Sequence, residues 1–393
     1  MRLLLSCGEP SGDLYAGALT TELRALVPGL SIAGMGGPRF SAAGGRVIED
    51  YRDLAVTGLA EALPKLSKFF SMRRHLVAYA RDERPDALVL IDAPDANLRL
   101  ARAVRRLIPG IPIVYYISPQ IWAWRSGRMA AIRRLVDRML VIFPFEEAIY
   151  RNAGVPVEFV GHPLVDLAVP SQPRDGFLTH LGLDARAKTV AVLPGSRPNE
   201  VARILPELVA ACRIIATRVP GVQFVVARAP ELGDELFAVC GVAGQRRFVV
   251  VEGETDAVLA SADVALTASG TATVQAALHD TPMVVVYRLS PLTYRIGRRL
   301  VRVDTFGMVN LIAGRRIAPE LIQEAFTATA VADEAEALLT DAERIRTARQ
   351  ALAEVRTKLV GHGASRRAAE AVIRVVQTAA AERARSTALS GAS

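Results

Sequence analysis

The sequence predicts an α/β protein of two doubly wound, parallel-sheet domains followed by a helical C-terminal segment. Short runs rich in Val, Ile and Leu alternate with longer segments of helical period along most of the chain, which is typical of parallel α/β folds. The 393 residues are too many for one ordinary core, so two domains are expected. The segment 168–176 has two prolines and little apolar content, and it is the best candidate for the link between them.

The expected strands follow this alternation. In the first half they lie at 3–7, 31–34, 87–91, 113–117, 139–142 and 157–160. In the second half they lie at 189–193, 223–227, 248–251, 264–266 and 282–287.

The predicted boundaries give five segments: a first domain, a linker region, a second domain, C-terminal helices packing back on the domains or on a partner protomer, and a disordered tail, at 1–167, 168–187, 188–340, 341–380 and 381–393. Two doubly wound domains would face a central cleft at the carboxyl ends of their strands, where open α/β sheets bind ligands. Each turn from strand to helix is therefore a candidate site.

Composition narrows the class of protein. Hydrophobic residues make up 51% of the chain, yet no apolar run approaches the ~20 residues that span a bilayer, and the apolar N-terminal run is too short for a signal peptide. Cys7, Cys212 and Cys240 are too widely spaced for a disulfide framework or a zinc motif, so a reducing cytoplasm is expected. The net charge of +8 favours phosphorylated substrates or anionic lipid, since no nucleic-acid-binding motif is visible.

Two turns in the second half are suited to phosphate. Gly195, Ser196 and Arg197 follow the strand at 189–193 and open a helix, whose unpaired N–H groups and dipole attract anions. Ser269, Gly270 and Thr271 do the same after the strand at 264–266, and Gln275 one turn later would reach a ribose hydroxyl. Each turn alone is explained by helix capping, but both together favour a diphosphate.

Three stretches of the first half carry candidate side chains. Glu9, Ser11, Gly12 and Asp13 form the first turn, for which simple capping is the default. Asp92 ends an apolar strand, where a partly desolvated carboxylate is suited to general-base work, whereas Asp95 is interpreted as a helix cap. Gln120, Trp122 and Trp124 follow the strand at 113–117; the indoles would stack on a sugar or line an acyl pocket, or simply pack.

The stretch 56–74 mixes apolar residues with cations, among them Leu63, Leu66, Phe69, Phe70 and Arg73. Such a mixture suits contact with a membrane surface or with acyl chains. A core-facing helix with a basic outer face fits the spacing equally well.

Taken together, these motifs resemble the lipid-A-disaccharide synthase family. GEPSGD, GGPRF, IDAPDAN, SPQIWAWR, the Gly161-His162 pair, LPGSR, ASGTA and VNLIAGR occur in the family's order between residue 3 and about residue 325. SPQIWAWR and IDAPD are highly specific, whereas LPGSR and ASGTA alone would indicate only a nucleotide-sugar protein.

The resemblance implies a glycosyltransferase with two Rossmann-like domains (GT-B architecture). It would transfer 2,3-diacylglucosamine from UDP-2,3-diacylglucosamine to 2,3-diacylglucosamine 1-phosphate, giving the β-1′,6-linked disaccharide 1-phosphate and UDP without a cofactor or metal. It would sit peripherally on the cytoplasmic face of the inner membrane. A homodimer is a further expectation, because the helical C-terminus would be able to exchange between protomers.

Residue by residue, Asp92 matches the family's catalytic aspartate and Arg197 its key arginine, while Asn310 keeps its place in VNLIAGR. The resemblance implies a first domain that faces the acceptor and the membrane and a second that binds the UDP-sugar. The residues expected to contact the acceptor or the sugar are Glu9, Ser11, Gly12, Asp13, Gln120, Trp122, Trp124 and Asn310. Two positions depart from the family pattern. Gln275 stands where a glutamate is expected to meet the ribose, and Val309 replaces a proline. Both leave room for a related enzyme with shifted specificity.

Other hypotheses remain at this point. Another UDP-sugar enzyme of the same fold, such as an epimerase, would share the diphosphate turns without needing the WAWR segment. A non-catalytic binding protein would tolerate loss of Asp92. An anionic-lipid or nucleic-acid scaffold, which rests only on net charge, predicts steep salt dependence without competition by UDP.

Overall fold

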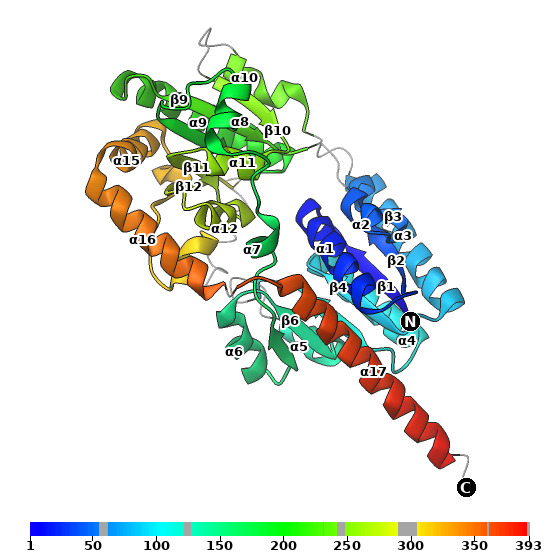
Figure 1. Cartoon of the computed structure of the whole chain (residues 1–393). Helices are drawn as coiled ribbons and strands as arrows, with labels where there is room; N and C mark the ends of the chain where they lie inside the picture. The colour runs from blue at the N-terminus through cyan, green and yellow to red at the C-terminus, as the bar shows by residue number, and fades with distance from the viewer. Residues whose placement is uncertain are drawn as a thin grey trace. The chain divides into compact units, whose positions relative to one another are not determined.

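The computed structural model describes residues 1–54, 62–121, 127–230, 232–241, 248–289, 305–359 and 361–390, with side chains except those of 54, 62–67 and 386–390. The chain divides into two compact units, both drawn in Figure 1. Unit 1 is Met1–Pro163 together with Gly361–Ser393, and unit 2 is Leu164–Val360. The chain therefore returns to unit 1 after completing unit 2.

Unit 1 contains a seven-stranded sheet in the order β3-β2-β1-β4-β5-β6-β7, in which every pair is parallel. Its central strand β4 is buried at every residue, as a parallel sheet covered on both faces requires. The strands are β1 (Arg2–Cys7), β2 (Ser31–Gly36), β3 (Arg46–Asp50), β4 (Ala87–Ile91), β5 (Ile113–Tyr116), β6 (Arg138–Val141) and β7 (Val157–Phe159).

The helices of unit 1 pack on this sheet. Four of them begin with proline, which suits the first helical position because its missing N–H would be unpaired there anyway. The helices are α1 (Pro10–Leu26), α2 (Pro38–Ala42), α3 (Ala62–Glu83), α4 (Pro94–Leu107), α5 (Arg128–Leu135), α6 (Pro144–Asn152) and α17 (Ala364–Ser390), with a 3-10 turn η1 (Tyr51–Leu54).

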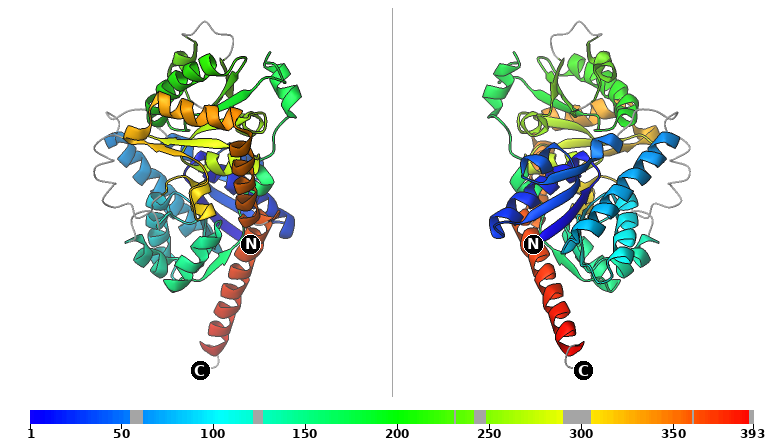
Figure 2. Two further views of the ribbon diagram at one scale, coloured as in Figure 1. Left: turned by 90° about the vertical axis from the view of Figure 1, so that its left-hand side faces the viewer. Right: turned by 90° about the vertical axis from the view of Figure 1, so that its right-hand side faces the viewer.

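The last helix, α17, packs beside α1 (Figure 1). Arg367 donates from Nε to the carbonyl of Val160 at 2.8 Å, and Arg374 reaches Glu158 at 2.7 Å. Among the described side chains of this helix, Val376 is the last that is buried, and beyond it the helix projects away from the sheet (Figure 2). The expected disordered tail at 381–393 is thus helical as far as Ser390.

Unit 2 contains a six-stranded parallel sheet in the order β10-β9-β8-β11-β12-β13. The strands predicted from the sequence account for both sheets, except for the two edge strands β3 and β13, which the sequence analysis missed. The strands are β8 (Thr189–Leu193), β9 (Gln223–Arg228), β10 (Phe248–Glu252), β11 (Val264–Ala268), β12 (Met283–Tyr287) and β13 (Glu320–Ile322).

The predicted linker region contains a helix that packs on unit 2. Arg174 at its start donates to the carbonyls of Ser261 at 2.6 Å and Ala187 at 3.0 Å. The helices of the unit are α7 (Leu164–Leu167), α8 (Arg174–His180), α9 (Pro198–Arg218), α10 (Ala238–Gly241), α11 (Thr255–Ala260), α12 (Thr271–Leu278), α14 (Met308–Ala313), α15 (Ala328–Thr340) and α16 (Ala342–Lys358), with 3-10 turns η3 (Asp234–Phe237) and η4 (Gln323–Ala325).

Two features are absent from the part of the chain that the structure describes. None of the helices there has the length and apolar character needed to cross a membrane. No group of three or more His, Cys, Asp or Glu side chains in the same part of the chain is arranged to hold a metal ion.

Candidate active site

The turns of unit 1 that carry candidate side chains leave one edge of its sheet. Cys7 pairs with Ile91 in the register of β1 and β4, and Ile91 pairs with Tyr116 in that of β4 and β5. The turns after these strands are therefore neighbours. A Cβ on Gly8 would lie 2.8 Å from that of Ala93, so only glycine allows the GEPSGD turn to approach the IDAPD turn this closely.

Asp92, the candidate base, opens the turn after β4 with a left-handed backbone. Its φ is +48° and that of Ala93 is +44°, a conformation that non-glycine residues adopt only where the surroundings hold them. The carbonyl oxygen of Asp92 accepts hydrogen bonds from Nδ2 of Asn97 at 2.7 Å and from the hydroxyl of Tyr115 at 2.5 Å. The half-buried side chain of Asp92 therefore stands on a fixed and strained backbone.

Asn97 is a positioning residue that the sequence analysis missed. Its side chain is fully buried, and its Oδ1 accepts from the hydroxyl of Ser6 at 2.7 Å. Its Nδ2 also lies 3.0 Å from the carbonyl of Ile91. The amide thus joins the ends of β1 and β4. The signal was present as the last letter of IDAPDAN, a polar residue on a helix face that otherwise packs into the core.

Asp13 has a structural role, not the sugar contact expected for it. Its carboxylate is buried and accepts from the backbone N–H groups of Gly37 at 2.7 Å, Arg39 at 2.9 Å and Phe40 at 3.1 Å. Both oxygens therefore cap the start of α2, which is the GGPRF segment. The spacing of two separate motifs in the sequence does not reveal that one caps the other.

The remaining residues of this first turn lie at the sheet edge. Glu9 is the N-cap of α1 and is half-buried, as is Ser11. Gly12 is buried, and a Cβ there would lie 3.2 Å from that of Cys7. These three positions are next to the Asp92 turn, and their contact with a sugar stays a prediction.

Two hydrogen bonds with residues of α6 fix the loop after β5. The hydroxyl of Ser118 donates to Oε1 of the buried Glu146 at 2.6 Å, and the hydroxyl of Tyr150 donates to the carbonyl of Pro119 at 3.3 Å. Burial raises the pKa of Tyr150, so it remains a neutral donor. Gln120, the next residue, is exposed. The loop is thus anchored up to the position where the predicted acceptor contacts begin.

His162 is enclosed by aromatic rings. Its centroid lies 5.3 Å from that of Phe143 and 6.3 Å from that of Tyr15. Burial lowers the pKa of His162 to about 3, so the ring is neutral in the folded protein.

This burial predicts a pH-dependent loss of stability. In the unfolded chain, the pKa of His162 is near 6.5, so the unfolded state binds a proton below that pH. In the folded protein, His162 binds this proton only near pH 3. The contribution is fully present above pH 6.5 and is lost as pH falls, by roughly 2 kcal/mol between pH 7 and pH 5. Denaturant unfolding should show that His162→Phe loses less stability than wild type over this range. Equal losses would contradict the assignment.

In unit 2, the turn after β8 already binds an oxyanion from its own chain. Gly195 has φ +119°, and a Cβ there would lie 2.2 Å from Oε2 of Glu200. The N–H of Ser196 donates to the same oxygen at 3.2 Å. Arg197, the N-cap of α9, is exposed beside it. Glu200, which sequence analysis missed, therefore caps this turn through the N–H of Ser196.

Tyr287 ends β12 next to this turn. Burial raises the pKa of its hydroxyl, Glu200 raises it further, and Arg197 opposes both. The two charged groups of this turn are therefore close enough to Tyr287 to act on its hydroxyl.

At the turn after β11, one of the three expected phosphate donors, Ser269, is already bonded within the protein. The N–H of Ser269 donates to the carbonyl of Val286 at 3.0 Å, and its hydroxyl donates to that of Phe306 at 2.8 Å. Ser269 thus has no donor left for phosphate. Gly270 is the N-cap of α12 and Thr271 its first, exposed residue, so their N–H groups precede the first intrahelical bond.

Asn310 also has a structural role in place of the expected sugar contact. Its side chain is 1% exposed. Its Oδ1 accepts from the N–H groups of Ile317 at 2.7 Å and Ala318 at 2.9 Å, and its Nδ2 donates to Glu320 at 2.7 Å. Asn310 therefore shapes the loop that follows VNLIAGR.

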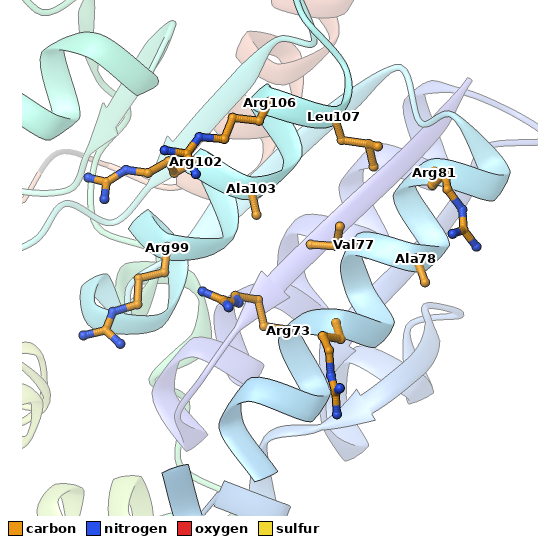
Figure 3. A pocket seen from close by; sticks show the side chains of 10 residues that line it. Arg73, Val77, Ala78, Arg81, Arg99, Arg102, Ala103, Arg106 and Leu107 are labelled. Carbon is orange, nitrogen blue, oxygen red and sulfur yellow. The ribbon is translucent and has the colours of Figure 1, made fainter. Parts of the chain in front are cut away.

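A cationic groove lies between α3 and α4 of unit 1 (Figure 3). It has a volume of about 530 Å³ and no carboxylate among its lining residues. We call it the arginine groove. Its six arginines are Arg73, Arg74 and Arg81 from α3 and Arg99, Arg102 and Arg106 from α4.

Two aromatic rings continue the arginine groove. The guanidinium of Arg73 lies 5.1 Å from the ring centroid of Phe70, and that of Arg99 lies 5.9 Å from that of Phe69. Phe70 is 41% exposed. The same helix buries Met72 and Leu76 in the core, so contact of Phe69, Phe70 and Arg73 with a membrane or acyl chain stays a prediction.

Four predicted contacts fall where the structure gives no side chain. Trp122 and Trp124 lie outside the described residues, and the side chains of Leu63 and Leu66 lie outside the described ones.

The two parallel-sheet units give the chain the GT-B architecture. The UDP-GlcNAc 2-epimerase from Neisseria meningitidis bound to UDP-GlcNAc superimposes with a TM-score of 0.65 at 10% identity, over 96% of this chain and 100% of that one. The calicheamicin glycosyltransferase superimposes with a TM-score of 0.58 at 17% identity, over 96% and 98%. At these identities the likeness shows the fold alone.

The chain belongs to the lipid-A-disaccharide synthase family. The family model described as lipid-A-disaccharide synthetase matches residues 3–375. The lipid-A-disaccharide synthase of Geobacter metallireducens is 42% identical, over 95% of this chain and 97% of that relative. That of Koribacter versatilis is 43% identical, over 96% and 99%. The resemblance inferred from the motifs is confirmed.

Membership defines the activity. The protein is a glycosyltransferase of lipid A biosynthesis, which transfers 2,3-diacylglucosamine from UDP onto 2,3-diacylglucosamine 1-phosphate with inversion at the anomeric carbon.

Proposed function

We propose that Asp92 is the general base of this transfer. The observation that supports it most is its backbone, which is held in the left-handed region by Asn97 and Tyr115, because such strain is typical of functional positions. Asp92 takes the proton from the acceptor 6-hydroxyl as that oxygen forms a bond to the anomeric carbon. The bond from that carbon to the UDP oxygen breaks on the opposite face, and its electron pair leaves with UDP.

The leaving diphosphate is stabilised by unit 2. The N–H groups at Gly195 and Ser196, those of Gly270 and Thr271, and the guanidinium of Arg197 meet its oxygens. Helix N-termini and a fixed cation stabilise negative charge as it develops. We propose that they do so without a metal ion. The anion site is supported by the N–H of Ser196, which pairs with the Glu200 carboxylate that the diphosphate would displace.

The acceptor is assigned to the sheet edge of unit 1. Glu9, Ser11 and Gly12 adjoin the Asp92 turn, and Gln120 is exposed after β5. Trp122 and Trp124 keep the role predicted for them from the sequence. Asp13 and Asn310 are left out because their polar groups are bonded within the protein.

The activity is tested by incubating the purified protein with both substrates in EDTA and analysing products by mass spectrometry, with UDP binding measured in parallel. Disaccharide 1-phosphate and UDP in equal amounts are expected. UDP binding without product would indicate another acyl sugar. Product formed only after metal is restored would overturn the metal-free mechanism.

We further propose that the protein sits peripherally on the cytoplasmic face of the inner membrane, with the arginine groove against anionic lipid headgroups. Arg99, Arg102 and Arg106 lie at spacings of three and four along α4, so they share one face. Exposed Phe70 suits the interface between headgroups and acyl chains. The homodimer stays a prediction from the sequence.

Replacing Arg99, Arg102 and Arg106 by glutamine should lower binding to phosphatidylglycerol vesicles by about tenfold or more, since each basic residue near an anionic surface contributes about 1 kcal/mol. The matched control replaces Arg344, Arg346 and Arg349, exposed residues of α16, with the same change in net charge. Co-sedimentation measures both. Equal losses in the two variants would show that net charge alone drives binding.

A further inference from the structure

A side-chain network joins α11 to α12 in unit 2 and adds to Gln275 two residues, Asp256 and His279, to which neither the motifs nor the mechanism gives a role. Oδ1 of Asp256 accepts a hydrogen bond from Nε2 of Gln275 at 3.0 Å and lies 2.9 Å from Nε2 of His279. The His279 side chain is 7% exposed and that of Asp256 is 23% exposed. A nearly buried imidazole thus fixes a carboxylate that still reaches the surface.

Two acceptor atoms of this network remain available. Oδ2 of Asp256 and Oε1 of Gln275 have no hydrogen-bond partner within the described part of the chain. One oxygen belongs to a carboxylate, and the other belongs to an amide that spends one of its two N–H donors on that carboxylate. The pair therefore leaves two acceptor oxygens and one amide N–H for a ligand. Its complement is a ligand with two neighbouring hydroxyl groups.

The network lies next to the diphosphate turns. β10 and β11 are parallel members of one sheet, so α11 and α12 both start from its carboxyl edge. Gln275 follows Thr271 by four residues on α12, which places it on the same helix face, roughly 6 Å along the axis. A diphosphate at Thr271 would leave the attached sugar of its nucleoside within reach of Gln275.

We propose that Asp256 and Gln275 together bind the vicinal 2′,3′-diol of the donor's ribose, and that His279 is the positioning residue that orients Asp256. This inference rests on the proposed UDP site of unit 2. Asp256 supplies the negative charge, because a hydroxyl donates more strongly to a carboxylate than to an amide. Gln275 accepts the second hydroxyl through Oε1 while its N–H group keeps the carboxylate in place.

The test compares binding of UDP and of 2′-deoxyuridine 5′-diphosphate by calorimetry. Wild type should prefer UDP by about tenfold or more, as expected for a hydrogen bond to a charged group. Asp256→Ala should weaken the binding of UDP by a similar factor. It should leave the affinity for 2′-deoxyuridine 5′-diphosphate within about threefold of wild type, so that the preference for UDP disappears. Asp256→Asn, which keeps the shape of the side chain, should retain only part of the preference for UDP. Thermal unfolding checks that both variants fold.

Arg197→Ala is the matched control, because it should weaken both nucleotides equally and keep their ratio. An unchanged ratio in Asp256→Ala, or equal binding of the two nucleotides by wild type, would overturn the ribose assignment while leaving the diphosphate site intact. Failure of wild type to bind either nucleotide would instead overturn the proposed UDP site, and this inference with it.

Discussion

Asp92→Asn is expected to lower kcat by about 10²- to 10⁴-fold, the usual contribution of a general base, while UDP affinity stays within about twofold of wild type. Asparagine tolerates the left-handed backbone better than most residues, and the bonds from Asn97 and Tyr115 go to the backbone carbonyl. The variant should therefore keep the geometry of the turn and lose only the base. Steady-state turnover with both substrates measures the effect.

The matched control is Asp95→Asn in the same turn. Asp95 is exposed and pairs with Arg128 at 2.5 Å, so this variant removes a neighbouring carboxylate and should change kcat by less than about threefold. If Asp92→Asn turned over at the rate of the control, another group would have to accept the proton.

Arg197→Ala is expected to lower kcat/KM by about 10²- to 10³-fold, as removal of one stabilising donor does in other enzymes. It should also weaken UDP binding while leaving uridine unaffected, since the guanidinium is assigned to the diphosphate. Arg197→Lys should recover only part of the loss, because lysine keeps the charge but not the planar fork of donors. Turnover and calorimetry with UDP and uridine separate these effects.

Arg203→Ala, on an exposed position of α9, serves as control with the same change in net charge. A loss of uridine affinity in Arg197→Ala would show that the variant disturbs the whole nucleotide site. A turnover equal to that of Arg203→Ala would remove Arg197 from the mechanism.

The central strands of both sheets were predictable because their apolar runs are long and lack competing signals. The edge strands were not. Only partly buried residues make up β3, apart from an exposed Arg46, and β13 has three residues, so neither carries a period that sequence analysis can recognise. Local sequence pattern likewise could not predict that α17 returns to unit 1. That return depends on packing against α1, which is more than 300 residues away in the sequence.

For the site, the sequence located the turns but not the partners of each side chain. Asp92 and Arg197 lie where a strand ends and a helix begins, which hydrophobic pattern alone locates. Asp13 and Asn310 are also polar residues in recognisable motifs, but each accepts hydrogen bonds from N–H groups of a separate segment. Asn97, Glu200 and Asp256 were missed for the converse reason: their importance depends on contacts with residues that only the fold brings near.

The most direct test of the central claim is the configuration of the linkage in the disaccharide 1-phosphate made by the wild-type protein. Proton NMR of the purified product reports it through the coupling between H1′ and H2′. A single displacement assisted by Asp92 predicts the large coupling of a β linkage from the α-linked donor. A small coupling, indicating an α linkage, would require retention and would contradict a mechanism in which one base and one inversion complete the transfer.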